Sequence, residues 1–211
     1  TLTYAITAGN TNTTFAINSS TGAITLNNPP GVDFETAPTT FNLTVTVTDD
    51  GTPVLNDTAA ITVNVNDVND PPTANDDTFS IDENSADGAA VGTVSATDPD
   101  AGQTLTYAIT AGNTNTTFAI NSSTGAITLN NPPGVDFETG PTTFNLTVTV
   151  TDDGTPMLDD TAAITVNVND VNEAPTAVNE SYAAQSNVGV APNAMNGLLV
   201  NGTDPDSGDS L

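Results

Sequence analysis

Acidic residues of this chain gather in short segments that also contain asparagine, glycine and proline, and together they could bind a metal ion. The segment NDVNDPPT at residues 66–73 places Asp67 and Asp70 around Asn69, just before a double proline. Calcium takes six to eight oxygen ligands from carboxylates, asparagine side chains, backbone carbonyls and water. Asp and Asn at alternate positions can direct several of these oxygens at one ion, so the segment predicts a calcium site.

Similar segments recur along the chain, at the ends of predicted strands. Their carboxylates belong to Asp33, Glu35, Asp49, Asp50, Glu83, Asp98, Asp100, Asp136, Glu138, Asp152, Asp153, Asp170 and Glu173. Any single pair could be a solvated turn, because Asp, Asn and Gly are common turn residues. Acidic segments that recur in a fixed order in a chain without basic residues favour metal binding.

The charge composition excludes most enzyme classes and two kinds of partner. The chain has 211 residues, with 26 Asp and Glu, no Lys, Arg or His, no Cys and a formal net charge of -26. It therefore lacks an imidazole base, a Schiff-base lysine, a thiolate and a disulfide. Paired carboxylates such as Asp98 and Asp100 can perform acid–base chemistry, but in this setting they predict metal binding, and we expect no enzyme.

The same negative charge bears on the partners of the chain. Its field repels nucleic acid and anionic membrane surfaces. No run of about 18 apolar residues is present, so we expect no membrane insertion. Self-repulsion opposes compaction unless cations bind, and the counter-charge must therefore come from metal ions or salt.

An internal repeat sets the organisation of the chain. The segment that begins TLTYAITAGN at Thr1 recurs at Thr104, 103 residues later. Residues 1–74 and 104–177 differ at five positions, namely Ala37/Gly140, Val54/Met157, Asn56/Asp159, Asp70/Glu173 and Pro71/Ala174. This period suits an array of separate domains. We predict an incomplete repeat at 1–70, a complete repeat at 71–173 and the first strands of a diverged third repeat at 174–211.

The elements that must position the acidic segments are predicted to be β-strands. Apolar and polar residues alternate over 41–48 and 59–65, the pattern of strands with one buried face. Residues 14–26 predict two short strands around a turn, and no segment has helical spacing. Several short strands per repeat predict an all-β sandwich. A threonine array for binding ice is disfavoured, because one TVTVT strand per domain gives no extended surface.

Residues 77–175 resemble the cadherin repeat almost end to end. The matching motifs are SIDEN at 80–84, VSATDPDAG at 94–102, FAINSSTGAITL at 118–129, VDFE at 135–138, FNLTVTVTDDGTP at 144–156 and NDVNEAP at 169–175. The third segment is more similar to the related tandem repeats of large bacterial surface proteins. The resemblance implies an all-β fold of tandem Greek-key β-sandwich domains, arranged end to end.

The resemblance also implies calcium at each junction, with ligands shared by consecutive repeats. For the first junction it implies Asp33, Glu35, Asp67, Asn69, Asp70, Asp98, Asp100 and Asp152. For the second junction it implies Glu83, Asp136, Glu138, Asp170, Asn172, Glu173, Asp204 and Asp206. The third segment has AAQSN where a Glu-Asn motif is expected, and Glu173 replaces Asp70. We therefore expect the first junction to bind calcium more extensively or more tightly.

These features predict calcium-rigidified extender repeats of an extracellular, bacterial surface adhesin or fibre. The expected partners are neighbouring repeats, copies of the same chain and surface glycans. A calcium-dependent carbohydrate-binding module is one alternative, although Tyr107, Phe118 and Phe144 are expected in the core and not on a sugar-binding surface. Homophilic adhesion is another, although the chain has no Trp for a strand-swap anchor.

The ends of the sequence allow two interpretations. It begins partway through the repeat pattern, and Leu211 aligns with Leu2 and Leu105. The favoured interpretation is a window cut from a longer chain. The alternative is a head-to-tail filament, in which residues 176–211 of one copy complete the sandwich of the next by strand addition.

Overall fold

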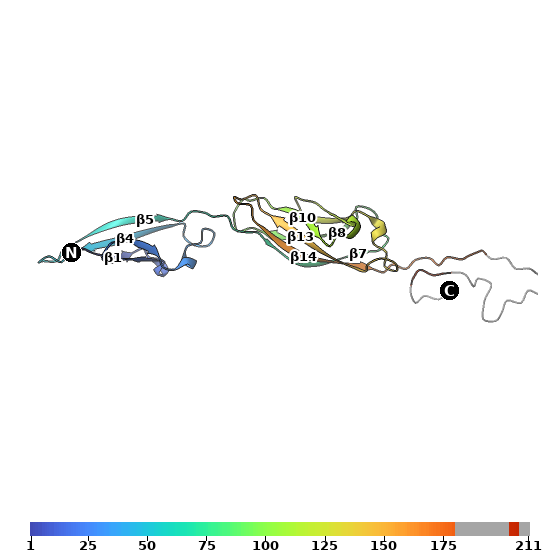
Figure 1. Ribbon diagram of the computed structural model, residues 1–211, viewed down its shortest axis with the longest axis horizontal. Coiled ribbons are helices and arrows are strands. Elements are labelled where there is room, and N and C mark those ends of the chain that lie inside the picture. The colour runs from blue at the N-terminus through green and yellow to red at the C-terminus, as the bar shows by residue number, and fades with distance from the viewer. Residues whose placement is uncertain (180–202, 207–211) are drawn as a thin grey trace, which may run out of the picture. The chain divides into compact units, whose positions relative to one another are not determined.

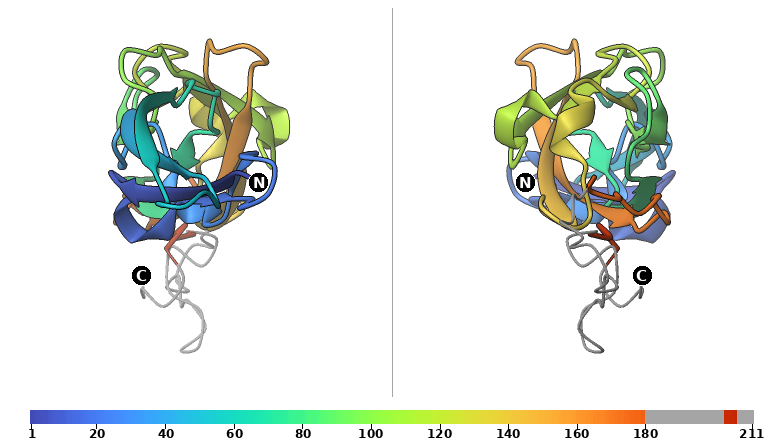
Figure 2. Two further views of the ribbon diagram at one scale, coloured as in Figure 1. Left: turned by 90° about the vertical axis from the view of Figure 1, so that its left-hand side faces the viewer. Right: turned by 90° about the vertical axis from the view of Figure 1, so that its right-hand side faces the viewer.

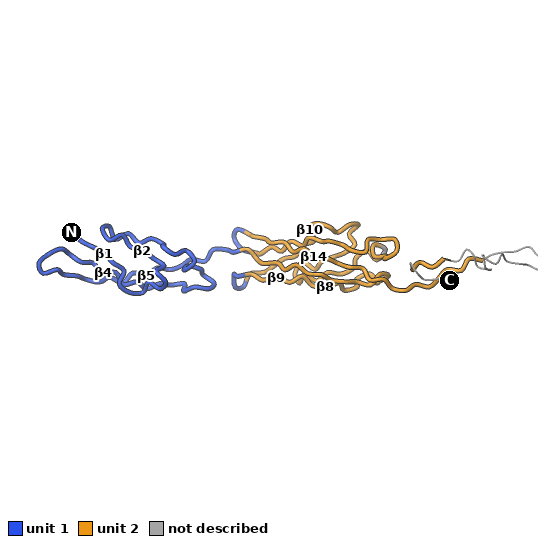
Figure 3. The backbone as a smooth tube through the Cα atoms, turned by 90° about the horizontal axis from the view of Figure 1, so that it is seen from below, with its two compact units in different colours: residues 1–70, 99–102, 154–156 blue, residues 71–98, 103–153, 157–211 orange. Residues whose placement is uncertain are grey.

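A computed structural model describes residues 1–179 and 203–206, and the chain divides into two compact units (Figure 3). Unit 1 comprises Thr1–Asp70, Pro99–Gly102 and Gly154–Pro156, and unit 2 comprises Pro71–Asp98, Gln103–Asp153 and Met157–Leu211. Most of the predicted third repeat, including AAQSN and Leu211, lies outside the described residues. The repeat boundaries at 1–70, 71–173 and 174–211, and the completion by residues 176–211, stay predictions.

Unit 1 contains one three-stranded sheet and one hairpin. Its elements are β1 (Thr3–Ala8), η1 (Thr11–Thr13), β2 (Phe15–Ile17), β3 (Ile24–Leu26), η2 (Pro29–Gly31), β4 (Thr40–Thr48) and β5 (Asn56–Asn64). The sheet has the order β1-β4-β5, and β2 pairs with β3. The hairpin of β2 and β3 confirms the two short strands predicted over 14–26.

Unit 2 repeats these elements and adds strands at both sheets (Figure 1). Its elements are β6 (Thr73–Ala74), β7 (Asp77–Asp82), β8 (Ala90–Thr93), β9 (Ala96–Thr97), β10 (Thr106–Ala111), η3 (Thr114–Thr116), β11 (Phe118–Ile120), β12 (Ala126–Leu129), η4 (Pro132–Gly134), β13 (Thr143–Thr151) and β14 (Asp159–Asn169). The sheets have the orders β10-β13-β14-β7 and β11-β12-β8, and β6 pairs with β9.

The strand pattern of β13 builds the core of unit 2. Phe144, Leu146, Val148 and Val150 have exposed fractions of 5%, 2%, 0% and 0%, whereas the residues between them are exposed or half-buried. Successive side chains of a strand point to opposite faces, so this alternation gives one buried face and one solvated face. The ring of Phe144 meets that of Phe118 edge to face, at 5.1 Å between centroids. The predicted all-β sandwich is confirmed.

The described residues contain strands and single turns of 3₁₀ helix but no α-helix (Figures 1 and 2). None of the described helices is long and apolar enough to cross a membrane.

Corresponding strands have different neighbours in the two units. In unit 2, β7 pairs in parallel with β14, and β8 pairs antiparallel with β12. Among the described residues of unit 1, the corresponding edges of β5 and β3 carry no such strands. Burial differs accordingly, since Leu129 of β12 is 1% exposed and its counterpart Leu26 of β3 is 47% exposed.

This difference predicts unequal effects of one substitution in the two units. Val166→Ala should destabilise unit 2 by about 2 kcal/mol, because removing fully buried methyl groups loses transfer free energy and leaves a cavity. Val166 is 0% exposed, whereas its counterpart Val63 is half-buried, so Val63→Ala should cost unit 1 roughly half as much. Hydrogen exchange in denaturant, followed separately for β5 and β14, measures both losses. Equal losses would contradict the difference in packing.

Candidate metal centre

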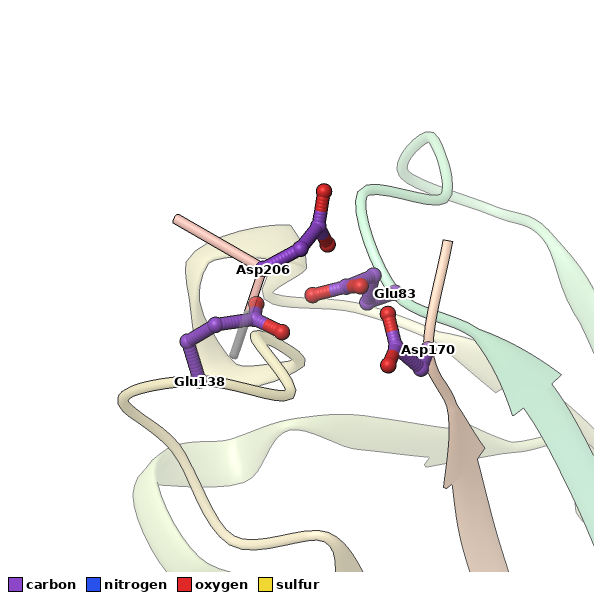
Figure 4. A group of neighbouring side chains, drawn as sticks. All are labelled: Glu83, Glu138, Asp170 and Asp206. Carbon is purple, nitrogen blue, oxygen red and sulfur yellow. The ribbon is translucent and has the colours of Figure 1, made fainter. Parts of the chain in front are cut away.

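Four carboxylates of unit 2 converge in what we call the second acidic group: Glu83, Glu138, Asp170 and Asp206 (Figure 4). One oxygen from each residue lies within 4.8 Å of the corresponding oxygens of the others. Glu83 follows β7, Asp170 follows β14, and Glu138 lies in the loop before β13. Asp206 comes from the described part of the C-terminal segment.

Glu83 is the most deeply buried member of the second acidic group, with 2% of its surface exposed. It follows β7, and the parallel pairing of β7 with β14 brings its backbone N–H to the Asn169 carbonyl at 3.0 Å. Its carboxylate accepts hydrogen bonds from the backbone N–H groups of Phe137 and Val171, both at 2.7 Å. A buried carboxylate held by two amides keeps further lone pairs for a cation.

Glu138 lies in the loop after η4, which Asp136 organises. The Asp136 carboxylate accepts a hydrogen bond from the Thr139 backbone N–H at 2.7 Å, and its contacts with Thr139 lower the pKa of Asp136. The pKa of Glu138 is instead raised to about 6, first by partial burial and then by the negative charges of Glu83 and Glu173. Neighbouring Asp and Glu side chains thus take different tasks, since Asp136 shapes the loop and Glu138 joins the acidic group.

Asp206 is held by two sets of backbone hydrogen bonds. Thr176 and Thr203 form an antiparallel bridge, with N–H to carbonyl distances of 2.7 and 2.9 Å. The Asp206 carboxylate then accepts a hydrogen bond from the Glu173 backbone N–H at 2.6 Å, and Asp204 accepts one from the Asp206 N–H at 3.2 Å. Asp206 is 8% exposed as a result.

The second acidic group fits a hard cation. Its donors are all carboxylate oxygens, which calcium prefers. Oδ1 of Asp206 and Oε2 of Glu173 are buried and have no hydrogen-bond partner among the described residues. A buried charged oxygen without a partner is costly, and a bound cation would remove that cost. Glu83, Glu138, Asp170 and Asp206 would hold it, with Glu173 beside them.

In unit 1, a first acidic group brings together Glu35, Asp70 and Asp100, again within 4.8 Å. The Asp70 backbone N–H donates to the Asp100 carboxylate at 2.8 Å, the same contact that Glu173 makes with Asp206. Partial burial and the charge of Asp67 raise the pKa of Glu35. The two groups share the pairs Glu35/Glu138 and Asp100/Asp206, whereas Asp70 belongs to the first group and its counterpart Glu173 lies beside the second.

The remaining predicted ligands have other described contacts. Asp33 accepts hydrogen bonds from the backbone N–H groups of Thr36 and Glu35. The pKa of Asp33 is lowered, first by its contacts with Thr36 and then by those with Glu35. Asp152 is 2% exposed and accepts one from the Leu158 N–H at 2.9 Å. The side-chain amide of Asn69 donates to the Pro156 carbonyl, and that of Asn172 donates to the Glu173 carbonyl. Asp98 follows β9 in unit 2 and belongs to neither group.

Two positioning features were missed by sequence reasoning. The side-chain amide of Asn84 donates a hydrogen bond to the Glu173 carboxylate. The backbone φ angle of Asn84 is 55°, in the left-handed region that asparagine tolerates better than most residues. The Thr176–Thr203 bridge places Asp206. The sequence signal for that bridge is the TDPD motif itself, which begins at Thr203 as it does at Thr97, and Thr97 pairs with Thr73, the counterpart of Thr176.

The raised pKa of Glu138 predicts a pH dependence of calcium binding. Calcium requires the ionised carboxylate, so protons compete with it as the pH falls through about 6, the folded-state pKa of Glu138. Calcium affinity should fall several-fold between pH 7.5 and pH 5.5. Without calcium, the stability of the folded state depends on pH in the opposite direction. Protonated Glu138 favours the folded state, and this contribution to stability is lost as the pH rises from about 4.5 through about 6. Calcium titrations of Glu138→Gln, which should lack this part of the pH dependence, provide the check.

Repeated all-β units, each with a group of converging acidic side chains, define the class as tandem β-sandwich proteins. The chain belongs to the cadherin domain family, whose profile matches residues 1–66 and 77–169.

Relatives in animals support this assignment. The chain is 34% identical to human Protocadherin Fat 4 over 209 residues, covering 97% of this chain and 4% of that protein. It is 35% identical to the Protocadherin-like wing polarity protein stan of Drosophila melanogaster over 219 residues, covering 97% of this chain and 6% of that protein. The chain thus spans a small fraction of the relatives it matches.

Solved structures agree with the fold. The chain superposes on human CDH23 EC21-23 with a TM-score of 0.69 and 27% identity, covering 98% of this chain and 74% of that one. It superposes on the protocadherin gammaB7 EC3-6 cis-dimer structure with a TM-score of 0.65 and 27% identity, covering 98% and 52%. The cadherin-like prediction and the extracellular location are confirmed by this family, and the expectation of a non-enzymatic role agrees with it.

Proposed function

We propose that the chain consists of calcium-bound spacer repeats of an extracellular adhesin or surface fibre, with calcium held where consecutive repeats meet in the sequence. The observation that supports this most is the second acidic group, in which four carboxylates lie within 4.8 Å of one another. The chain contains no Lys, Arg or His to neutralise them. An external cation is therefore the available counter-charge.

The physical role follows from the repulsion between these carboxylates. Glu83, Glu138 and Asp170 come from the predicted second repeat, and Asp206 comes from the segment after it. Without a cation the charges repel, and the connection between the repeats is a hinge. Calcium supplies a shared positive centre when bound, so the residues on both sides of the linker bind one ion and the hinge stiffens.

The expected affinity matches an extracellular location. Extracellular calcium modules have dissociation constants of about 10⁻⁴ to 10⁻³ M. Sites in this range fill at the millimolar calcium of extracellular fluid or seawater and stay empty inside a cell. The same repeats would therefore be stiff only after they reach the outside.

Calcium binding and stiffening are tested by titration calorimetry and small-angle scattering of the full chain. We expect dissociation constants of about 10⁻⁴ to 10⁻³ M and a narrower distribution of dimensions in calcium. Glu138→Gln should weaken the binding, whereas Asp77→Asn, outside both acidic groups, should not. No heat of binding, together with identical scattering in calcium and chelator, would refute the proposal.

Finer parts of the functional prediction stay predictions. The relatives named above are animal proteins, so a bacterial adhesin is not supported by them. Glycan binding also stays a prediction. Phe118 and Phe144 do not support it, because they are buried against each other and offer no surface on which a sugar ring could stack.

A further inference from the structure

A short pair of strands in unit 2 lies next to residues of the first acidic group in the sequence. β6 and β9 are antiparallel, and their register places Thr73 opposite Thr97. Asp70 lies three residues before Thr73, and Asp100 lies three residues after Thr97. Because equal steps outward from an antiparallel pair lead to opposite residues, this register directs Asp70 towards Asp100. The Asp70 backbone N–H donates to the Asp100 carboxylate at 2.8 Å, which agrees with the register.

The second acidic group has the same arrangement. Thr176 and Thr203 form an antiparallel bridge. Glu173 lies three residues before Thr176 and Asp206 three residues after Thr203, and the Glu173 backbone N–H donates to the Asp206 carboxylate. In both places a pair of facing threonines sets which backbone amide meets which carboxylate. A contact that holds the threonine pair in register therefore also positions the acidic group.

β6 contains only two residues and is held from both sides. On one side, the Asn75 backbone N–H donates to the Ser95 carbonyl at 3.0 Å, next to the pairing with β9. Successive amides of a strand point to opposite sides, so the Ala74 N–H is directed away from β9. It donates to the Asp160 carboxylate at 3.0 Å. A pair of two short strands is marginally stable by itself, and Ala74 offers only one methyl group to the core of unit 2.

Asp160 is placed by the main sheet of unit 2 and not by the linker. It lies near the start of β14, opposite Val150 of β13, which is fully buried. Its hydrogen bonds with the backbone N–H groups of Ala74 and then Thr161 lower the pKa of Asp160, so it remains an ionised acceptor at neutral pH. Asp160 belongs to neither acidic group. The sheet therefore holds a fixed acceptor beside β6 that the metal centre does not use.

We propose that Asp160 is a positioning residue for the first acidic group. By accepting the Ala74 N–H it holds β6 in register with β9, and this register keeps Asp70 opposite Asp100. The proposal rests on the proposed calcium function and adds a carboxylate that acts on the calcium site without binding the ion. Without this acceptor, the two residues of β6 lose the hydrogen bond on their outer side and separate from β9 more often.

The two prolines of the linker carry this displacement to the metal centre. Pro71 and Pro72 are the only residues between Asp70 and β6. Because the proline ring fixes φ, a movement of β6 passes to Asp70 with little loss. Residues that orient metal ligands without touching the metal change metal affinity by about 10–100-fold. Since Asp160 acts through a linker, we expect the lower end of this range.

The test compares two substitutions of Asp160 in the full chain. Asp160→Ala removes the acceptor and one charge, whereas Asp160→Asn removes the same charge and keeps an acceptor oxygen for Ala74. Calcium titrations followed by NMR of the Asp70 and Glu173 backbone amides report on the two acidic groups separately, because these residues differ between the repeats. Asp160→Ala should weaken calcium binding at Asp70 about tenfold and leave binding at Glu173 unchanged. Asp160→Asn should restore most of the affinity.

Two further variants separate the hydrogen bond from charge and from folding. Asp159→Ala removes one charge from the exposed neighbour of Asp160 and should bind calcium like the parent chain. Ala74→Pro removes the donor of the same hydrogen bond without changing any charge. Proline is tolerated at a strand edge whose N–H faces away from the ladder, so this variant carries the test if Asp160→Ala does not fold. It should weaken calcium binding at Asp70 and not at Glu173.

The outcomes distinguish this proposal from the proposed function. No calcium-dependent shift at Asp70 or Glu173 in the parent chain would refute the calcium function, and the role of Asp160 in it. Calcium binding by the parent with the same affinity at Asp70 in Asp160→Ala would overturn the positioning role alone. Equal weakening by Asp160→Asn and Asp160→Ala would show a charge effect, and equal weakening at both acidic groups a general loss of folding. Either result would also overturn the positioning role.

Discussion

Removal of calcium should lower the melting temperature of the chain by about 10 °C or more. A ligand at a hundredfold excess over its dissociation constant stabilises the folded state by about 2.7 kcal/mol. For a domain of roughly 100 residues, each kcal/mol shifts the melting temperature by about 4–8 °C. The carboxylates of the second acidic group lie within 4.8 Å of one another, so their repulsion in chelator adds to this loss.

Calorimetric melting in calcium and in chelator measures the shift. Sodium chloride should be adjusted to equal ionic strength, because screening by salt also weakens the repulsion between carboxylates. Magnesium provides a further control, since it demands a tighter octahedral geometry and keeps its waters more readily. It should restore only part of the stability. Identical melting in calcium and in chelator at matched ionic strength is the result that this prediction forbids.

Substitution Glu83→Ala should abolish the stabilisation of unit 2 by calcium and cost about 2–3 kcal/mol in its presence. The variant removes a member of the acidic group and leaves the amides of Phe137 and Val171 without an acceptor. A buried donor left unsatisfied costs about 1–3 kcal/mol. In chelator the cost should be smaller, because the substitution also removes one of the mutually repelling charges.

Asp87→Asn is the matched control for the Glu83 substitution. Asp87 lies in the exposed turn between β7 and β8, outside the acidic group, so this variant also removes one negative charge but should keep the response to calcium. Glu83→Gln retains an acceptor for one amide and should fall between the two. If Glu83→Ala melts like the parent chain in calcium, Glu83 neither binds the ion nor anchors the loop.

The strands were predictable because their signal is local. The alternation of apolar and polar residues in β4 and β13 is present in any window of eight residues, and burial of one face enforces it. The acidic segments could be found in the sequence for the same reason, because each of them spans only a few consecutive residues. Convergence of those residues depends on tertiary pairing: the register of β14 with β7 places Glu83, and the bridge between Thr176 and Thr203 places Asp206.

Local patterns did not distinguish the acidic residues that stabilise their own loops from those that converge in the acidic groups. Asp33 and Asp136 were predicted as ligands beside Glu35 and Glu138, and their role as ligands stays a prediction. In the structure each accepts backbone N–H groups of its own turn. Such turns are a general property of Asp in this position relative to the amides that follow. The expectation that the first junction binds calcium more tightly stays a prediction, and the described geometry gathers more carboxylates in the second group.

The parallel pairing of β7 with β14 has a mechanical consequence. β7 is the first long strand of unit 2 and β14 its last, and they run side by side over six residue pairs, from Ile164–Asp77 to Asn169–Asp82. The chain enters this pair at the start of β7 and leaves it at the end of β14, and in a parallel pair these two points lie at opposite ends. Tension along the chain therefore loads the whole ladder in shear, and its hydrogen bonds must break together instead of opening one by one. This strand order suits a domain that carries force along its own length.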